Sequence, residues 1–172
     1  MLNLNPIVYI INILTENYKT QITFNKSCNY NQIYVYLLNK HVNIITNLMK
    51  FDLNFSEVSC LELSAFQKNN NIYVYWVYIH YKMLKNFIFI TNTNVIKSYQ
   101  MYFKNLLFLE REVQEMFGLK ILNLIDNRNL LLDYNKQYNP LLKSFFSEGF
   151  EEVYLNLFTD KLNYLQNYYI EL

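Results

Sequence analysis

The chain has 172 residues, a formal net charge of +1, two cysteines and two histidines. This length fits one domain with a possible appendage and is enough to bury a sizeable core. The nearly balanced charge excludes an overall electrostatic attraction to nucleic acid or to an anionic membrane.

The longest apolar run, IYVYWVYIHY at 72–81, is shorter than the roughly 20 residues of a membrane-spanning helix, so no direct membrane span is expected. The N-terminus lacks the features of a signal peptide or a mitochondrial presequence. The chain therefore stays where it is made, or its import signal is absent from this form. With two glycines it has no glycine-rich phosphate loop. Cys28 and Cys60 are not paired in a C-x-x-C motif and are expected to be buried, with no metal site.

The use of basic residues is uneven, with thirteen lysines and two arginines. Asn, Lys, Ile, Phe and Tyr are abundant while Gly, Ala, Pro and Arg are scarce, which indicates an AT-rich, organellar genome. Because lysine replaces arginine freely in such a chain, Arg111 and Arg128 mark positions where the planar guanidinium is needed.

The first half of the chain alternates between predicted helices and strands. A helix is expected over 6–18, with Pro6 at its first turn, followed by a strand over 20–25. An apolar stripe of helical period predicts a second helix over 31–50, with His41 as a core residue within the stripe.

Three β-branched and aromatic stretches follow, at 58–66, 72–81 and 86–91, and predict strands with His80 as a sheet residue. A helix is expected over 97–117. Its inner face comprises Met101, Leu106, Leu109, Val113 and Met116 or Phe117. Residues 1–118 are thus predicted to be an α+β domain with helices packed on a mostly antiparallel sheet.

The last third, residues 119–172, has short apolar groups without a lasting period, apart from a weak helical pattern at 159–169. It is too hydrophobic to be disordered, and it cannot form a core by itself. We therefore expect an extended C-terminal arm that buries its Leu, Phe and Tyr side chains against something else.

The segment LEREVQEMFGL, at 109–119, concentrates charge at the end of the last predicted helix. Arg111 and Glu115 are spaced to form an i, i+4 ion pair. Arg111 is expected to keep Glu110 and Glu112 ionised, and Gly118 fits the position that ends a helix. Local physics predicts a solvated, ion-paired helix end, whereas the retention of arginine favours a more specific role.

This segment resembles the signature of the thirty-kilodalton-type subunit of respiratory complex I, NADH:ubiquinone oxidoreductase. The family pattern W-L-E-R-E-x-x-D-M-F-G-I corresponds to 108–119, with Phe108 for Trp and Glu115 for Asp. The resemblance continues through further spaced positions to residue 154. The corresponding residues are Asp126, Arg128, Leu131, Asp133, Tyr134, Pro140, Leu141, Lys143, Phe145, Gly149, Glu152, Val153 and Tyr154.

The resemblance implies a core subunit of the peripheral arm, on the matrix side of the mitochondrial inner membrane, without a catalytic site or cofactor of its own. FMN, iron–sulfur clusters and ubiquinone would then belong to neighbouring subunits. The chief partner would be the large quinone-site subunit, which the C-terminal arm of residues 119–172 would wrap, and no nucleic acid would be bound. Expected interface residues are Glu110, Arg111, Glu112, Phe117, Gly118, Asp126, Arg128, Asp133, Tyr134, Pro140 and Lys143.

The sequence also departs from the family pattern, and its composition is shared by other classes of protein. The departures are Leu124, Ile125, Asn129, Asn139, Leu142, Ser144 and Phe146, several of which remove charged contacts from the expected arm. An organellar ribosomal protein would share the composition but needs a strong basic excess, which this chain lacks. A cofactor-free enzyme using Glu110 or His80 as a general base would need a convergent cluster of catalytic residues, which the sequence does not indicate.

Overall fold

The computed structural model describes residues 32–52, 55, 57–82, 84–134, 138–145 and 151–166. The helix expected over 6–18, the strand expected over 20–25 and Cys28 lie outside these residues.

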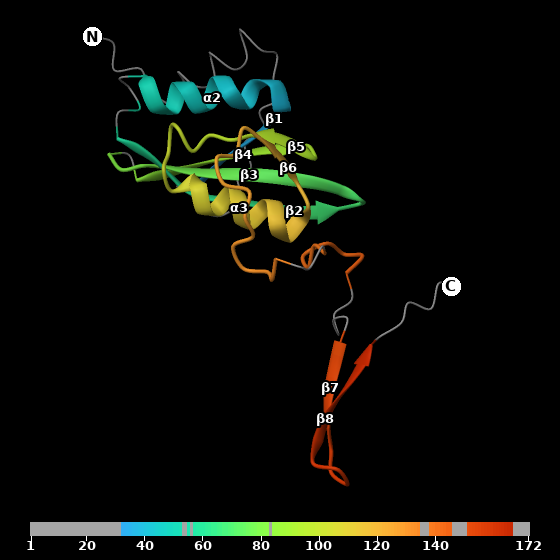
Figure 1. Ribbon diagram of the computed structural model, residues 1–172. Helices are drawn as coiled ribbons and strands as arrows, with labels where there is room; N and C mark the ends of the chain where they lie inside the picture. Colours follow the sequence, from blue (N-terminus) through green and yellow to red (C-terminus); the bar gives the residue numbers. More distant parts are fainter. Residues whose placement is uncertain are drawn as a thin grey trace, which may run out of the picture.

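A four-stranded sheet forms the centre of the domain (Figure 1). Its strands are β1 (Gln32–Leu37), β2 (Val58–Lys68), β3 (Asn71–His80) and β4 (Lys85–Asn92), in the spatial order β1-β4-β3-β2. β1 is parallel to β4, whereas β2–β3 and β3–β4 are antiparallel. The three predicted strands and the mostly antiparallel α+β fold are thereby confirmed.

The turn between β2 and β3 is a two-residue loop of Asn69 and Asn70, with φ of 48° and 62°. Both positions of a type I′ hairpin turn require positive φ, and asparagine tolerates that conformation better than most residues. This turn sets a register in which Phe66 opposes Tyr73, and their rings stack with centroids 5.3 Å apart.

The core lies on one face of the sheet and includes Trp76, Tyr78 and Phe89. Helix α2 (Asn39–Phe51) contributes Val42, Ile45 and Met49 to the same cluster. His41, Cys60 and His80 are buried, as expected for core and sheet residues.

The helix predicted over 31–50 is wrong in its first part, because residues 32–37 are β1 and the helix begins at Asn39. In β1 the alternate residues Val35 and Leu37 are buried while Tyr36 is exposed, which is a strand period of two. Both periods place Ile33 and Leu37 on one side, and the parallel pairing with β4 decides for the strand.

The helix predicted over 97–117 also begins later, because α3 spans Leu106–Phe117. Residues 95–97 form β5 (Val95–Lys97), which precedes α3 in the chain. It pairs in parallel with β6 (Lys120–Leu122), which follows α3. Residues 98–105 form turns and irregular structure, and Met101 is 89% exposed rather than on an inner face. Leu106, Val113 and Phe117 are buried as expected, and the core continues past Gly118 to Leu119 and Ile121.

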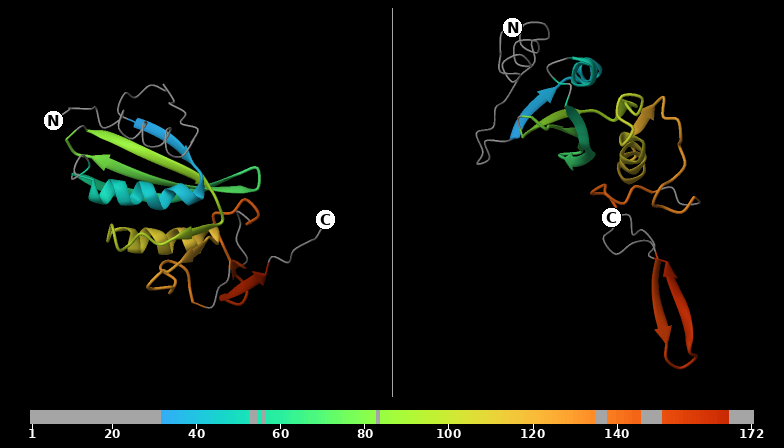
Figure 2. Two further views of the ribbon diagram at one scale, coloured as in Figure 1. Left: turned by 90° about the horizontal axis from the view of Figure 1, so that it is seen from above. Right: turned by 90° about the vertical axis from the view of Figure 1, so that its left-hand side faces the viewer.

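In the described part of the C-terminal region, β7 (Glu151–Asn156) and β8 (Lys161–Gln166) form a β-hairpin. The helix predicted over 159–169 is therefore wrong for its described residues, because cross-strand pairing with β7 determines their conformation. Two views show this hairpin projecting away from the body of the domain (Figures 1 and 2).

Candidate docking surface

Helix α3 ends at Gly118, whose φ of +67° is left-handed and whose N–H donates to the Gln114 carbonyl at 2.9 Å. Leu119 then turns back into the core, where it is 2% exposed. A Cβ at position 118 would lie 2.6 Å from Nδ2 of Asn139. Glycine is thus favoured here by the left-handed backbone conformation, and any larger residue would also displace the Asn139 side chain.

Glu110 points from α3 into the protein and is fully buried. Its carboxyl group accepts hydrogen bonds from Ser98 Oγ at 2.5 Å and from the Tyr99 N–H at 2.6 Å. Burial raises the pKa of Glu110, and these two hydrogen bonds oppose that shift. This shift is opposite in direction to the one expected from the neighbouring Arg111, because desolvation of the buried carboxyl group outweighs the hydrogen bonds. Glu110 therefore connects α3 to residues 98–99. Because its side chain is fully buried in the domain, it offers no surface to a partner.

Arg111 points from α3 toward the loop that follows β6. Its Nε donates to the Arg128 carbonyl at 2.9 Å and its Nη2 donates to the Asn129 carbonyl at 3.0 Å. Its Nη1 lies 3.4 Å from Oδ2 of Asp126. Arg111 thus contacts two backbone carbonyls within the chain, which confirms the expectation that its planar guanidinium is needed at this position, because a lysine ammonium lacks this fork of donors.

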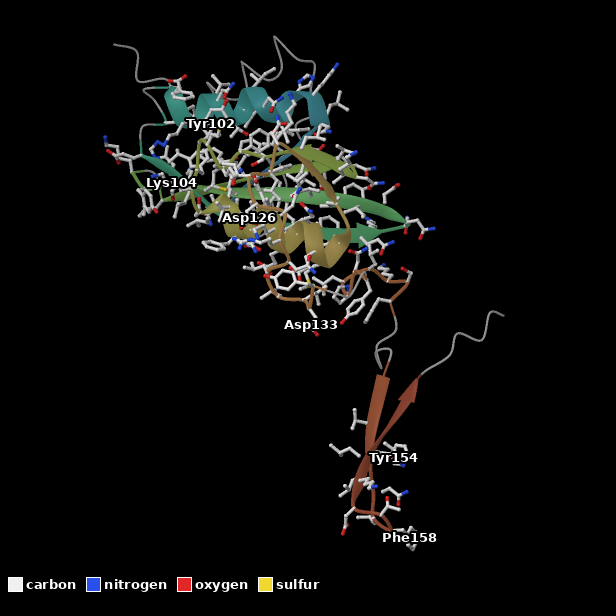
Figure 3. The ribbon with its side chains drawn as sticks, in the orientation of Figure 1. Tyr102, Lys104, Asp126, Asp133, Tyr154 and Phe158 are labelled. Carbon is white, nitrogen blue, oxygen red and sulfur yellow. The ribbon has the colours of Figure 1, made fainter. Side chains whose placement is uncertain are left out.

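Asp126 connects both arginines, and Figure 3 shows it beside α3. Its carboxylate accepts hydrogen bonds from the Arg128 Nε and Nη2 at 2.9 and 2.8 Å, and from the Arg128 N–H at 3.1 Å. These Arg128 contacts lower the pKa of Asp126 well below its ordinary value, and Arg111 adds to the effect. The two arginines therefore share one carboxylate, which fixes the start of the loop.

Glu115 lies one helical turn after Arg111 and holds the next part of the same loop. Its carboxylate accepts from the backbone N–H groups of Leu130 at 2.8 Å, of Leu131 at 3.1 Å, and of Leu132. Contacts with the loop backbone replace the expected Arg111–Glu115 ion pair. Arg111 donates to backbone carbonyls of the loop, and Glu115 accepts from its backbone N–H groups. Successive N–H groups that converge on one carboxylate form an anion-binding nest.

The loop held in this way presents apolar side chains to solvent. Ile125, Leu131 and Tyr134 are 76%, 62% and 71% exposed. Asp133 lies at the outer side of this loop (Figure 3), and its carbonyl accepts from Asn129 Nδ2 at 3.2 Å. We call Arg111, Asp126 and Glu115 the clasp, and residues 124–134 the clasped loop. An ordered loop with large exposed apolar side chains is typical of a protein interface.

The next described segment, 138–145, is tied back to the body of the domain. The Leu141 N–H donates to the Met116 carbonyl at 3.1 Å, and the Lys143 N–H donates to Gln67 Oε1 at 2.8 Å. Pro140 is half-buried beside the end of α3, whereas the Lys143 side chain is exposed. This segment thus extends the surface formed by the clasped loop.

The structure divides the sequence-predicted interface residues into three groups. Glu110, Phe117 and Gly118 have roles inside the domain. Arg111 and Asp126 order the clasped loop. Exposed members are Glu112, Arg128, Asp133, Tyr134 and Lys143, with Pro140 half-buried.

Sequence reasoning omitted Glu115 from its interface residues, although its i, i+4 spacing from Arg111 placed both on one side of α3. It also missed Ser98, whose contact with Glu110 depends on the β5–β6 pairing and has no local signal.

A small cavity of about 180 Å³ lies under the clasped loop, lined in part by Gln114, Asn127 and Tyr138. This is smaller than the roughly 300–1,000 Å³ of typical sites for drug-sized ligands. Among the described residues, no group of three His, Cys, Asp or Glu side chains is arranged to hold a metal ion. None of the described helices is long and apolar enough to cross a membrane.

Comparisons with known proteins agree with this architecture. The family model for the respiratory-chain NADH dehydrogenase 30 Kd subunit matches residues 30–151. The chain is 38% identical over 123 residues to NADH-ubiquinone oxidoreductase subunit 9 of Paramecium primaurelia. It is 33% identical over 123 residues to the protein of the same name from Paramecium tetraurelia. Each match covers 71% of this chain and 59% of the relative, so the chain spans about three fifths of their length.

The fold is similar to a chain in the structure of the membrane-bound sulfane sulfur reductase, an archaeal respiratory membrane complex. The TM-score is 0.66 at 12% identity, and the match covers 83% of this chain and 86% of that one. This likeness shows the fold class alone, an α+β domain. Within that class, the family match over 30–151 is decisive: the chain belongs to the family of the 30-kDa subunit of respiratory-chain NADH dehydrogenase.

Proposed function

We propose that this chain is a non-catalytic core subunit of the peripheral arm of respiratory complex I. It docks on and stabilises the large quinone-site subunit while electrons pass from NADH to ubiquinone and protons are translocated. Residues 119–172 are the interaction arm, and FMN, iron–sulfur clusters and ubiquinone are bound by neighbouring subunits. The chain then lies on the matrix side of the mitochondrial inner membrane, as a peripheral subunit.

The clasp is the observation that carries this proposal. Arg111 and Glu115 use charged side chains to order a surface loop rather than to assemble a reactive centre. The ordered loop keeps Ile125, Leu131 and Tyr134 exposed, at a cost that burial against a partner would offset. Family membership adds independent support, because the relatives' names describe them as subunits of NADH-ubiquinone oxidoreductase.

Co-migration tests the assembly directly. Mitochondrial membranes from the source organism would be solubilised in mild detergent and separated on a native gradient gel. The chain would be located by mass spectrometry and compared with in-gel NADH dehydrogenase activity. We expect both at the same very high mass. Migration with the ribosome, or as a free chain, would contradict the proposal.

Substitution in the clasped loop tests the surface. Leu131→Asp should reduce binding of the full chain to the purified large quinone-site subunit by at least about tenfold, as expected when an interface anchor is lost. Met101→Asp is a matched control, because Met101 is 89% exposed in the turns before α3, outside the clasped loop. Equal binding by both variants and by the wild type would argue against docking through this loop.

A further inference from the structure

The β7–β8 hairpin has an apolar face that the described body of the domain does not cover. In its register Leu155 opposes Leu162, and Val153 lies two residues before Leu155 on the same face of β7. These three side chains are 53–59% exposed. Figures 1 and 2 show the hairpin extending away from the sheet and both described helices.

The tip of the hairpin is ordered and carries its most exposed apolar side chains. The Phe158 N–H donates to Asn156 Oδ1 at 3.0 Å, and the Thr159 N–H donates to the Asn156 carbonyl at 3.2 Å. Leu157 is 80% exposed and Phe158 is fully exposed, at the far end of the hairpin in Figure 3. The hydrogen bonds of this turn therefore fix the backbone at Phe158, whose side chain is exposed to solvent.

Such a hairpin needs a partner on energetic grounds. An isolated two-stranded hairpin is at best marginally stable in water, because it has no second layer to bury its apolar face. An aromatic side chain presented on a fixed turn loses little conformational entropy when it binds, which favours an anchoring role. Binding would thus stabilise the hairpin and bury Phe158 in one step.

Charge indicates what kind of surface the partner offers. Residues 146–172 contain five carboxylate side chains and one lysine, a net −4 in a chain whose net charge is +1. Asp160 is exposed beside the tip. A negatively charged segment is repelled by an anionic membrane leaflet and attracted by a basic protein surface. The acidic end of the chain therefore favours a basic protein partner over lipid.

We propose that the β7–β8 hairpin is a second binding module, separate from the clasped loop. It inserts Leu157 and Phe158 into an apolar pocket of a neighbouring subunit, and basic side chains at the rim of that pocket face Asp160. This inference rests on the proposed function, since it requires an assembly with neighbouring subunits. Two attachment points on one chain raise the effective concentration of each for its own site.

Photo-cross-linking in the assembled complex identifies the occupant. A photoreactive benzoyl-phenylalanine would replace Phe158 in the full chain, and the cross-linked peptide would be sequenced after irradiation. We expect an apolar peptide of another subunit that contains or is flanked by Lys or Arg. Cross-links to lipid, to this chain itself or to an acidic peptide would overturn the proposal, as would the absence of any cross-link.

Substitutions then separate this inference from the proposed function. Phe158→Asp should weaken binding to the cross-linked subunit at least about tenfold and leave the thermal midpoint of the body unchanged, since Phe158 buries nothing in the free chain. If Phe158→Asp binds like the wild type while Leu131→Asp does not, the hairpin inference fails and the proposed docking stands. If both variants bind like the wild type, both fail.

Asp160→Asn tests the basic rim without disturbing the turn. Asp160 has φ of 49°, a conformation that asparagine also tolerates, so this variant removes charge and keeps the backbone. Its affinity should fall and depend less on salt than that of the wild type. An equal or higher affinity in the variant would overturn the basic-rim assignment.

Discussion

Arg111 and Glu115 lie one turn apart on α3 and bind opposite poles of one stretch of backbone. Arg111 takes the carbonyls of residues 128 and 129, and Glu115 takes the N–H groups of residues 130–132. An i, i+4 ion pair on a helix surface contributes roughly 0.2–0.5 kcal/mol, whereas a hydrogen bond to a charged group contributes about 1.5–3 kcal/mol. Arg111 and Glu115 therefore contribute more free energy through hydrogen bonds to the loop backbone than through an ion pair with each other, and these bonds order the loop.

Arg111→Lys should lower the free energy of unfolding by about 1–2 kcal/mol, because one ammonium group cannot bridge two carbonyls and Asp126 at once. Urea denaturation of the full chain measures this. Arg128→Lys is the matched control, since the Arg128 side chain is 74% exposed and an exposed ion pair is worth about 0–1 kcal/mol. In the native-gel assay, Arg111→Lys should reduce incorporation more than it reduces folding. Equal losses for both arginines would refute the clasp.

Glu115→Gln should leave the fold intact and loosen the clasped loop. Glutamine has one acceptor oxygen and no charge, so it cannot hold three N–H groups as a carboxylate does. Hydrogen exchange should therefore become faster at Leu130, Leu131 and Leu132 and stay unchanged in β3. Glu112→Gln on the exposed side of α3 should leave all these rates as they are. Unaltered exchange at 130–132 in the Glu115 variant would show that the nest does not order the loop.

Gly118→Ala should destabilise the domain in two separable ways. The left-handed φ of +67° costs an L-residue roughly 1–2 kcal/mol, and the added Cβ meets Asn139 Nδ2 at 2.6 Å. Asn139→Ala added to Gly118→Ala should recover the steric part and leave the backbone part. A thermal-denaturation double-mutant cycle measures this coupling. Strict additivity of the two substitutions would mean that the close approach carries no energy.

The fold was predictable from the sequence where the local pattern or composition of residues favoured one type of secondary structure. β3 is aromatic and β-branched throughout, and its interior place between β4 and β2 follows from that composition. The predicted secondary structure was wrong where pairing between distant strands determines the conformation of the backbone. Residues 32–37 fit a helical stripe and a strand equally until β4 is present, and β8 is a strand because β7 lies beside it.

The candidate site was predictable in its position but not in its contacts. Arginine and glycine are scarce in this chain, and the retained Arg111 and Gly118 both have special geometries: Arg111 contacts two backbone carbonyls, and Gly118 has a left-handed φ. The partners of Arg111 are backbone carbonyls seventeen and eighteen residues away, which no residue-type pattern encodes. Likewise, the burial of Glu110 depends on the β5–β6 pairing that brings Ser98 to α3.

Glu110→Gln should change the pH dependence of stability more than the fold. Glutamine can accept from the Tyr99 N–H and donate to Ser98 Oγ, so both contacts are retained without charge. In the wild type, burial raises the folded-state pKa above the ordinary 4.5, so the folded chain binds more protons than the unfolded chain between those two pKa values. The stability contributed by protonated Glu110 is complete below pH 4.5 and is lost as pH rises through the folded-state pKa.

Urea denaturation of both proteins from about pH 4 to pH 8 tests this linkage. The Glu110→Gln variant should gain stability relative to the wild type as pH rises, and the difference should level off above the folded-state pKa. Glu112→Gln, on the exposed side of the same helix, serves as the control and should show a smaller change. A Glu110→Gln difference that is the same at every pH would mean that Glu110 titrates alike in the folded and unfolded chains. The carboxyl group would then not be desolvated between α3 and the 98–99 turn.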